Sequence, residues 1–266
     1  MSPEPQAWHA LERGRGRPLV LLHGIGMAHT AWAPVIDRLA AERRVIAFDI
    51  PGFGRSQPLP PERSPTQPEL ARALAAELDR RELDQPVDIA GNSLGGHIAL
   101  ELAVLGRSRS VVALSPSGLW AGDPPLHPKL ALWGTRFMTV YGAGLLRSTL
   151  RFGPVRTAAF RVPVAAHGSR IPVSAALEAA SNFASAPAFA AVMKAGIVGF
   201  RDGDKVDVPV TVAFGERDLI FPSAGTRRRD LLPAHTRWLS LSGCGHVPMW
   251  DDPDLVARTI LKGTQG

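Results

Sequence analysis

The chain has 266 residues, 45% of them hydrophobic, which is enough for one large α/β domain with a full core and is unlike a disordered protein. Its one cysteine, Cys244, excludes an intramolecular disulfide and a cysteine metal cluster. The net charge is +6, and residues 227–229 form the one run of arginines, without interleaved aromatic residues. We therefore expect no nucleic-acid partner and interpret that run as a solvated helix face.

No apolar run approaches the roughly 20 residues of a membrane-spanning helix, so we expect no membrane partner. The first 17 residues are polar, include Pro3 and Pro5, and lack the apolar core of a secretory signal. We expect a cytoplasmic protein that is a monomer or a homodimer.

Short apolar runs alternate with helical patterns in the first half of the chain, which is typical of a mainly parallel sheet covered by helices on both faces. The predicted strands there cover residues 18–22, 45–48, 87–90 and 111–114. The predicted helices there cover residues 31–41, 67–83 and 94–105. The pattern resumes near the C-terminus with strands at 208–214 and 237–241 and helices at 223–232 and 253–261.

Between these halves, residues 119–204 contain no clear strand. The segment is rich in Trp, Phe, Met and Leu and is broken by Pro and Gly into short helical stretches. A loop of that length is improbable inside a compact domain. We therefore expect an inserted helical cap at 119–204 on an α/β core formed by residues 1–118 and 205–266.

A G-x-S-x-G pattern at residues 91–95 lies between a predicted strand and a predicted helix. On such a tight turn, small residues two positions before and after Ser93 let the strand and helix approach closely. The N–H of Leu94 then lies at a helix N-terminus, where it can bind negative charge. We predict that Ser93 is a nucleophile, although an ordinary turn with an incidental serine would give the same five letters.

Three further strand-end segments carry polar side chains. The first of them, residues 23–26, follows the first strong strand and reads His-Gly-Ile-Gly. The N–H of Ile25 is the first candidate for a second donor to an oxyanion, and the N–H of Gly26 is the second. His23 is interpreted as structural. Glu216 and Asp218 follow the strand at 208–214 and compete as the acid. His246 follows the last strand, and Gly243 and Gly245 just before it leave its loop free to aim the imidazole.

Together these segments resemble the α/β-hydrolase superfamily over nearly all of the chain except the cap. The matching patterns are His-Gly at 23–24, Asp-x-Pro-Gly-x-Gly-x-Ser at 49–56, Gly-x-Ser-x-Gly-Gly at 91–96, Gly-x-x-Asp at 215–218 and Gly-His at 245–246. The resemblance implies a fold of the eight-stranded, mainly parallel type with helices on both faces. It also implies a structural role for residues 49–56 and favours Asp218 over Glu216. An earlier acid position holds Ser115 and Ser117, which cannot serve.

The resemblance further implies catalysis by Ser93, His246 and Asp218 in the order Ser, Asp, His, without a metal or organic cofactor. His246 would act as the general base and Asp218 would orient it. We expect a small or medium apolar ester as the substrate, bound by cap and strand-end side chains. The candidate substrate-binding residues are Met27, Leu119, Trp120, Phe137, Tyr141 and Val247.

Other activities share this pattern. The stretch at 91–96 also resembles the C–C bond hydrolases of ring-cleavage diketones, although residues 25–27 lack that group's further glycine-rich pattern. Acyl transfer, thioester or lactone cleavage and perhydrolysis remain open. Haloalkane dehalogenases and epoxide hydrolases are disfavoured, because their relatives carry Asp where this chain has Ser93. A non-catalytic ligand receptor that kept the fold is the alternative outside enzymes.

Overall fold

The computed structural model describes residues 7–120 and 122–265, so Pro3 and Pro5 lie outside the described residues. One sheet forms the centre of the molecule, with strand order β1-β3-β2-β4-β5-β6-β7. β1 pairs antiparallel with β3, and every other neighbouring pair is parallel. The strands are β1 (Ala10–Arg13), β2 (Pro18–Leu22), β3 (Arg44–Phe48), β4 (Val87–Asn92), β5 (Ser108–Leu114), β6 (Val210–Gly215) and β7 (Arg237–Leu241).

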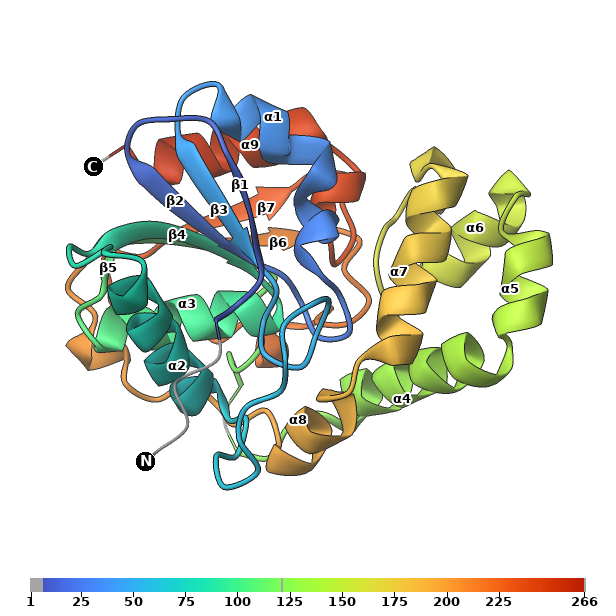
Figure 1. Cartoon of the computed structure of the whole chain (residues 1–266), viewed down its shortest axis with the longest axis horizontal. Coiled ribbons are helices and arrows are strands. Elements are labelled where there is room, and N and C mark those ends of the chain that lie inside the picture. Colours follow the sequence, from blue (N-terminus) through green and yellow to red (C-terminus); the bar gives the residue numbers. More distant parts are fainter. Residues whose placement is uncertain (1–6, 121, 266) are drawn as a thin grey trace.

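Helices cover both faces of this sheet. α1 (Ala33–Ala40) packs beside α9 (Pro253–Gly263) on one face, and α2 (Gln67–Arg80) packs beside α3 (Leu94–Val104) on the other (Figure 1). The central strands β4 and β6 are buried at every residue because both of their faces are covered. The predicted α/β class, with a mainly parallel sheet between helices, is confirmed. The described residues form seven strands, one fewer than the eight of the predicted type.

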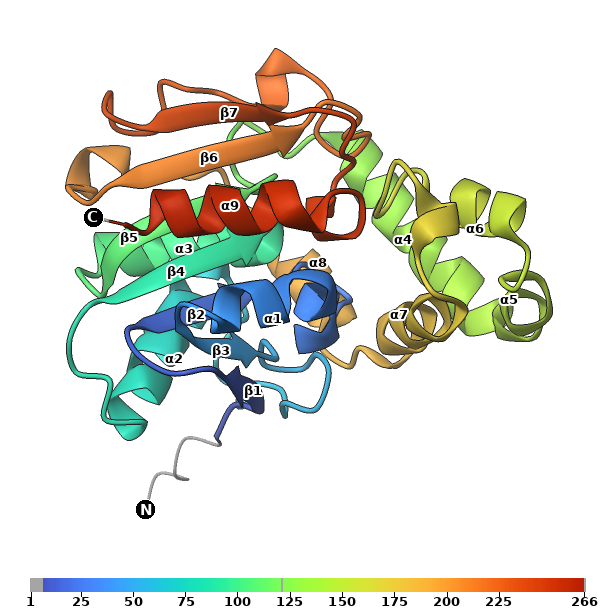
Figure 2. The same cartoon turned by 90° about the horizontal axis from the view of Figure 1, so that it is seen from above.

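Among the described residues, the five α-helices between β5 and β6 stand to one side of the sheet (Figure 2). They are α4 (Leu126–Tyr141), α5 (Ala143–Thr149), α6 (Gly153–Phe160), α7 (Val173–Ser185) and α8 (Phe189–Ala195). We call residues 122–200 the helical insertion. It contacts the core closely at two glycines: a Cβ on Gly26 would lie 2.3 Å from the Phe183 ring, and one on Gly52 would lie 2.2 Å from Ala188 Cβ.

The predicted helix at 223–232 is wrong, because the described chain has only a 3₁₀ turn at Ala224–Thr226 there. The backbone and side chains of this segment form hydrogen bonds with distant residues instead of within a helix. The N–H of Arg228 donates to Leu119 O, and Arg227 donates to the carbonyls of Phe221 and Gly215. The arginine run is therefore no helix face, and Arg227 instead lies over the Phe214 ring, 4.5 Å from its centroid.

In the part of the chain that the structure describes, no helix is long and apolar enough to cross a bilayer.

Candidate active site

Ser93 occupies the turn between β4 and α3 in a backbone conformation that serine rarely adopts, with φ 55° and ψ −114°. The two glycines of the motif explain how the turn is accommodated. A Cβ on Gly91 would lie 2.1 Å from Gly95 O, and one on Gly95 would lie 2.3 Å from Leu22 O. The close approach of α3 to β4 and β2 thus requires glycine at both positions, and it holds Ser93 at the carboxyl end of the sheet.

The loop after β2 lies against this turn. A Cβ on Gly24 would be 3.3 Å from Ser93 Cβ, and Ile25 faces the same cavity as Ser93. Leu94 is the first residue of α3, so its N–H lies outside the i to i−4 hydrogen bonds of the helix. Gly26 has φ 73°, and the Phe183 ring of α7 packs against its Cα.

His23 fixes this loop from beneath. The side chain is fully buried, and its Nε2 accepts from the Ile50 N–H at 3.0 Å. The imidazole proton is therefore on Nδ1, which donates to Gly24 O at 2.7 Å. Burial lowers the pKa of His23 to about 4, although the charge of Asp49 acts in the opposite direction. A neutral imidazole with both nitrogens bonded has no role as a base, in agreement with its structural interpretation.

Lowering the pH from 6.5 to 4 is expected to reduce the free energy of unfolding by about 3 kcal/mol through His23 alone. Between these values the unfolded chain binds a proton at His23 and the folded chain does not, so stability falls as pH falls. Urea unfolding of wild type and His23→Gln near pH 7 and pH 4.5 measures this difference. If the free energy of unfolding depends on pH equally in the two proteins, His23 is not the group that loses stability at low pH.

His246 and Asp218 lie together at the carboxyl ends of β7 and β6. His246 Nδ1 is 3.0 Å from Asp218 Oδ2 and 3.1 Å from Oδ1, and Oδ1 also accepts from the N–H groups of Ile220 and Phe221. Burial raises the pKa of Asp218, but the imidazole and the N–H bonds outweigh it and bring this pKa to about 2. Asp218 is therefore ionised at neutral pH and holds the Nδ1 proton of His246, which leaves Nε2 available as a base.

Glu216, the competing acid, lies elsewhere. It is exposed, and its Oε2 accepts from Ser242 Oγ at 2.9 Å and from the Gly243 N–H at 3.1 Å. Those bonds connect the loops after β6 and β7 on the outside of the molecule. The geometry thus favours Asp218 over Glu216 on grounds independent of any sequence pattern.

Two buried side chains that the sequence reasoning missed position the His246 loop. Asn92 Nδ2 donates to His246 O at 2.9 Å and to Leu114 O at 3.1 Å, which links the loop to the turn carrying Ser93. Asp251 Oδ2 accepts from the Gly245 N–H at 2.7 Å, and the same carboxylate accepts from the N–H groups of residues 166 and 167. The loop is thereby tied to both the core and the helical insertion. Neither residue stands out in the sequence, since each looks like an ordinary polar neighbour of a motif.

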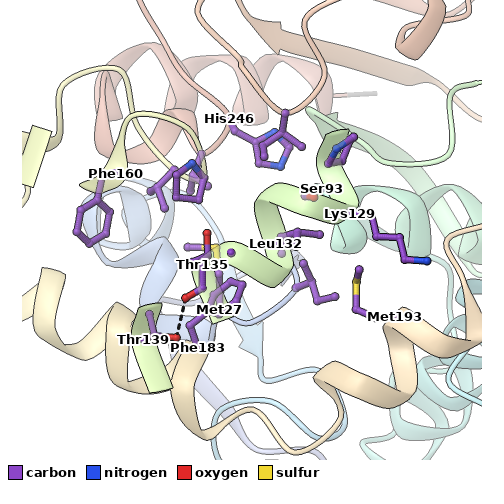
Figure 3. Close-up of a pocket in the computed structure, with 18 of the residues that line it drawn as sticks. Met27, Ser93, Lys129, Leu132, Thr135, Thr139, Phe160, Phe183, Met193 and His246 are labelled. Atoms are coloured by element: carbon purple, nitrogen blue, oxygen red, sulfur yellow. Dashed lines mark hydrogen bonds between the residues drawn. The ribbon is translucent and has the colours of Figure 1, made fainter. Parts of the chain in front are cut away.

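Ser93 and His246 face one cavity of about 530 Å³ between the sheet and the helical insertion. Figure 3 shows His246 and Ser93 in the upper part of the view, Phe160 at the left, Lys129 and Met193 at the right, and Phe183 below. Of the predicted site residues, the cavity lining includes Ile25, Met27, Ser93, Trp120, His246 and Val247. The sequence reasoning missed most of the wall that the insertion provides, including Pro128, Leu132, Thr135, Met138, Phe160, Phe183 and Met193.

Three predicted substrate-binding residues do not face this cavity. Leu119 is fully buried in the core cluster beside the sheet, whereas Phe137 and Tyr141 are exposed on the outer side of α4. Their assignment is corrected here: the composition of the insertion indicates an apolar wall but not which side of each helix faces inward. On α4 the inward side carries Leu132, Thr135 and Thr139 instead, with Thr139 Oγ1 donating to Thr135 O at 3.0 Å.

A second polar cluster lies away from Ser93. His9, His29 and Asp49 have potential metal-ligand atoms within 4.8 Å of one another. The Asp49 carboxylate already accepts from the N–H groups of His29 and Arg55 as well as from both histidine side chains. Burial raises its pKa, but these bonds together hold the pKa of Asp49 well below its ordinary value. We interpret the cluster as a hydrogen-bonded hub that joins β1 to the loops after β2 and β3.

The chain is similar to several known hydrolases. It is 30% identical over 210 residues to epoxide hydrolase EphH of Mycobacterium tuberculosis, covering 73% of this chain and 94% of that protein. It is 29% identical over 267 residues to 2-hydroxy-6-oxo-6-(2'-aminophenyl)hexa-2,4-dienoic acid hydrolase of Metapseudomonas resinovorans, covering 95% and 85% of the two chains.

Among solved structures, an esterase from Thermogutta terrifontis superposes with a TM-score of 0.70 over 96% of this chain and 92% of that chain. At 22% identity that likeness is one of fold. The model of the alpha/beta hydrolase family matches residues 19–259, which include both glycines of the Ser93 turn, Asp218 and His246. The chain belongs to the alpha/beta hydrolase family.

Proposed function

We propose that the protein is a serine hydrolase that cleaves a carboxylic ester of a small or medium apolar substrate through an acyl-enzyme. One observation carries the proposal: Ser93 and His246 face the same largely apolar cavity, and Asp218 holds His246 by its Nδ1 atom. The helical insertion would act as a cap that provides most of the acyl-binding wall. Family membership supports a hydrolase in general, and the serine at position 93 supports the covalent route.

The steps follow from the positions of these groups. Ser93 Oγ transfers its proton to His246 Nε2 as it attacks the ester carbonyl. The resulting oxyanion would accept hydrogen bonds from the N–H groups of Leu94 and Ile25, and each such donor is worth about 3–4 kcal/mol of barrier. His246 then gives its proton to the alcohol that leaves. A water molecule, deprotonated by His246, attacks the acyl-enzyme, and the protonated His246 returns the proton to Ser93 Oγ as the acid leaves.

Two relatives suggest other chemistry. Epoxide opening by a serine alkoxide would leave an ether, which water does not cleave at a useful rate, so the similarity to an epoxide hydrolase does not favour that activity with Ser93 as nucleophile. The second candidate function is C–C bond hydrolysis of a ring-cleavage diketone. Similarity to a dienoic acid hydrolase over 95% of this chain supports it, and it would use the same serine and histidine.

A series of p-nitrophenyl esters of rising acyl length tests the proposal. For an ester hydrolase with this apolar wall, we expect kcat/KM to rise by about fourfold per added methylene until the cavity is filled. The substitution Leu132→Trp narrows the cavity. We expect it to shift the acyl length with the highest kcat/KM to shorter chains. If wild type turns over a ring-cleavage diketone but none of the esters, the proposed ester hydrolysis is wrong and C–C bond hydrolysis is the function.

A further inference from the structure

The outer face of α4 is apolar although it lies in solvent. Leu126, Leu130, Trp133, Phe137 and Tyr141 recur at spacings of three and four residues, so they form one stripe along the helix. Their exposed fractions are 65%, 61%, 43%, 61% and 77%. The opposite side of the same helix lines the cavity through Pro128, Leu132, Thr135 and Thr139. A helix with apolar residues on both sides is ordinarily buried on both sides, which indicates that something covers this stripe.

The stripe continues onto the neighbouring helix and turn. Leu145 of α5 and Phe152, just after α5, are 60% and 51% exposed. Arg151 lies over the Phe152 ring, 4.8 Å from its centroid, so a cation and an aromatic ring are presented together. Both views place α5 and α6 farthest from the sheet, with α4 running out from the core toward them (Figures 1 and 2). We call the five stripe residues with Leu145 and Phe152 the outer apolar face.

The charge around this face is mostly positive. The helical insertion, residues 122–200, contains eight Lys or Arg residues and two acids, Asp123 and Glu178, so its net charge of +6 equals that of the whole chain. Among the described residues, none of these eight cations pairs with a carboxylate; Arg136 and Arg156, for example, donate to backbone carbonyls. Lys129, Arg147, Arg151 and Arg161 are exposed. The positive charge is therefore available to a partner.

We propose that the outer apolar face docks onto an anionic lipid surface. Apolar and aromatic side chains of an interfacial helix enter the boundary between headgroups and acyl chains, while neighbouring Lys and Arg side chains meet lipid phosphates. A second copy of this chain fits less well, because it would bring two helical insertions of net charge +6 together. This docking differs from a membrane span and revises the expectation that the protein has no membrane partner.

Docking would also place the cavity near the lipid. Leu126, the first residue of the stripe, also lines the cavity together with Lys129, so the stripe and the cavity meet at the N-terminal end of α4. An amphiphilic molecule leaving the lipid surface would thus meet the apolar cavity wall first. The docking itself does not require the proposed ester hydrolysis, since it rests on residues away from Ser93.

Vesicle co-sedimentation of the full chain tests the proposal. We expect wild type to bind vesicles of phosphatidylcholine mixed with phosphatidylglycerol and to bind phosphatidylcholine alone weakly, with added salt reducing the binding. Leu130→Ser/Phe137→Ser should weaken binding by about tenfold or more, because it removes apolar area that enters the lipid. Arg147→Glu/Arg151→Glu should remove the preference for the anionic vesicles. Ser93→Ala should bind as wild type does, which separates docking from turnover.

Leu105→Ser is the matched control, since Leu105 is an exposed leucine at the end of α3, on the core. Its vesicle binding should equal that of wild type, and thermal unfolding of all variants should show that each is folded. Wild type that stays in solution with anionic vesicles would overturn the proposal. So would a wild-type dimer in light scattering that Leu130→Ser/Phe137→Ser converts to a monomer, because the face would then be covered by a second copy.

Discussion

Replacing Ser93 by alanine is expected to lower kcat for ester hydrolysis by about 10⁶-fold and to leave the fold intact. The side chain is 8% exposed and faces the cavity, so removing its hydroxyl removes the attacking atom without opening a large void. The turn itself is maintained by Gly91 and Gly95, which the substitution does not touch. Steady-state kinetics and thermal unfolding of the variant measure the two effects separately.

Ser117→Ala is the matched control for that variant. Ser117 is also a buried serine beside the turn, and its N–H donates to Ser93 O. Its hydroxyl has no hydrogen-bond partner among the described residues, so its loss should change kcat little. A Ser93→Ala protein that turns over ester at a rate comparable with wild type would show that another group is the nucleophile.

Replacing Asp218 by asparagine is expected to lower kcat by about 10⁴-fold. The amide cannot stabilise the imidazolium, and its NH₂ group favours the tautomer that carries the proton on Nε2, which then cannot accept from Ser93. Because the pKa of Asp218 is about 2, the wild-type carboxylate stays ionised throughout the working pH range. The loss should therefore appear in kcat at every pH at which wild type is active.

Glu216→Gln is the control, because Glu216 lies two residues away on the same loop and bonds to Ser242 and Gly243 rather than to His246. Its kcat should stay within a few-fold of wild type. A larger loss in Glu216→Gln than in Asp218→Asn would reverse the assignment of the acid, and equal losses would indicate that the loop as a whole, rather than one carboxylate, limits the rate.

The strands that were predictable are those with a clear apolar pattern in the sequence, whether the strand is buried, as β2 is, or partly exposed at the sheet edge, as β7 is. β2 and β7 have the predicted bounds, since a continuous apolar run or a strong alternation marks them between turn residues. β1 was missed because three of its four residues are exposed and it lies at the sheet edge. The false helix at 223–232 shows the limit of local pattern: there, Arg228 bonds to Leu119, more than a hundred residues earlier.

The candidate site could be predicted where a serine, an acid or a histidine directly follows a predicted strand. Parallel strands bring their carboxyl ends to one edge, so Ser93, Asp218 and His246 could be expected to meet once the strands were identified. Asn92 and Asp251 could not be found in this way, because their role depends on carbonyl and N–H groups of distant loops. The cavity wall was predicted in composition only. Phe137 faces out and Leu132 faces in on the same helix, and that choice is made by packing against α7 and the core cluster.

Reaction with a fluorophosphonate, followed by mass spectrometry of the peptides, tests the central claim most directly. The claim is that Ser93 is a nucleophile activated by His246. We expect one phosphonyl adduct in wild type, on Ser93, formed slowly or not at all in Asp218→Asn and absent from Ser93→Ala. Folded wild type that forms no adduct, or one whose adduct lies on another residue, would contradict the account.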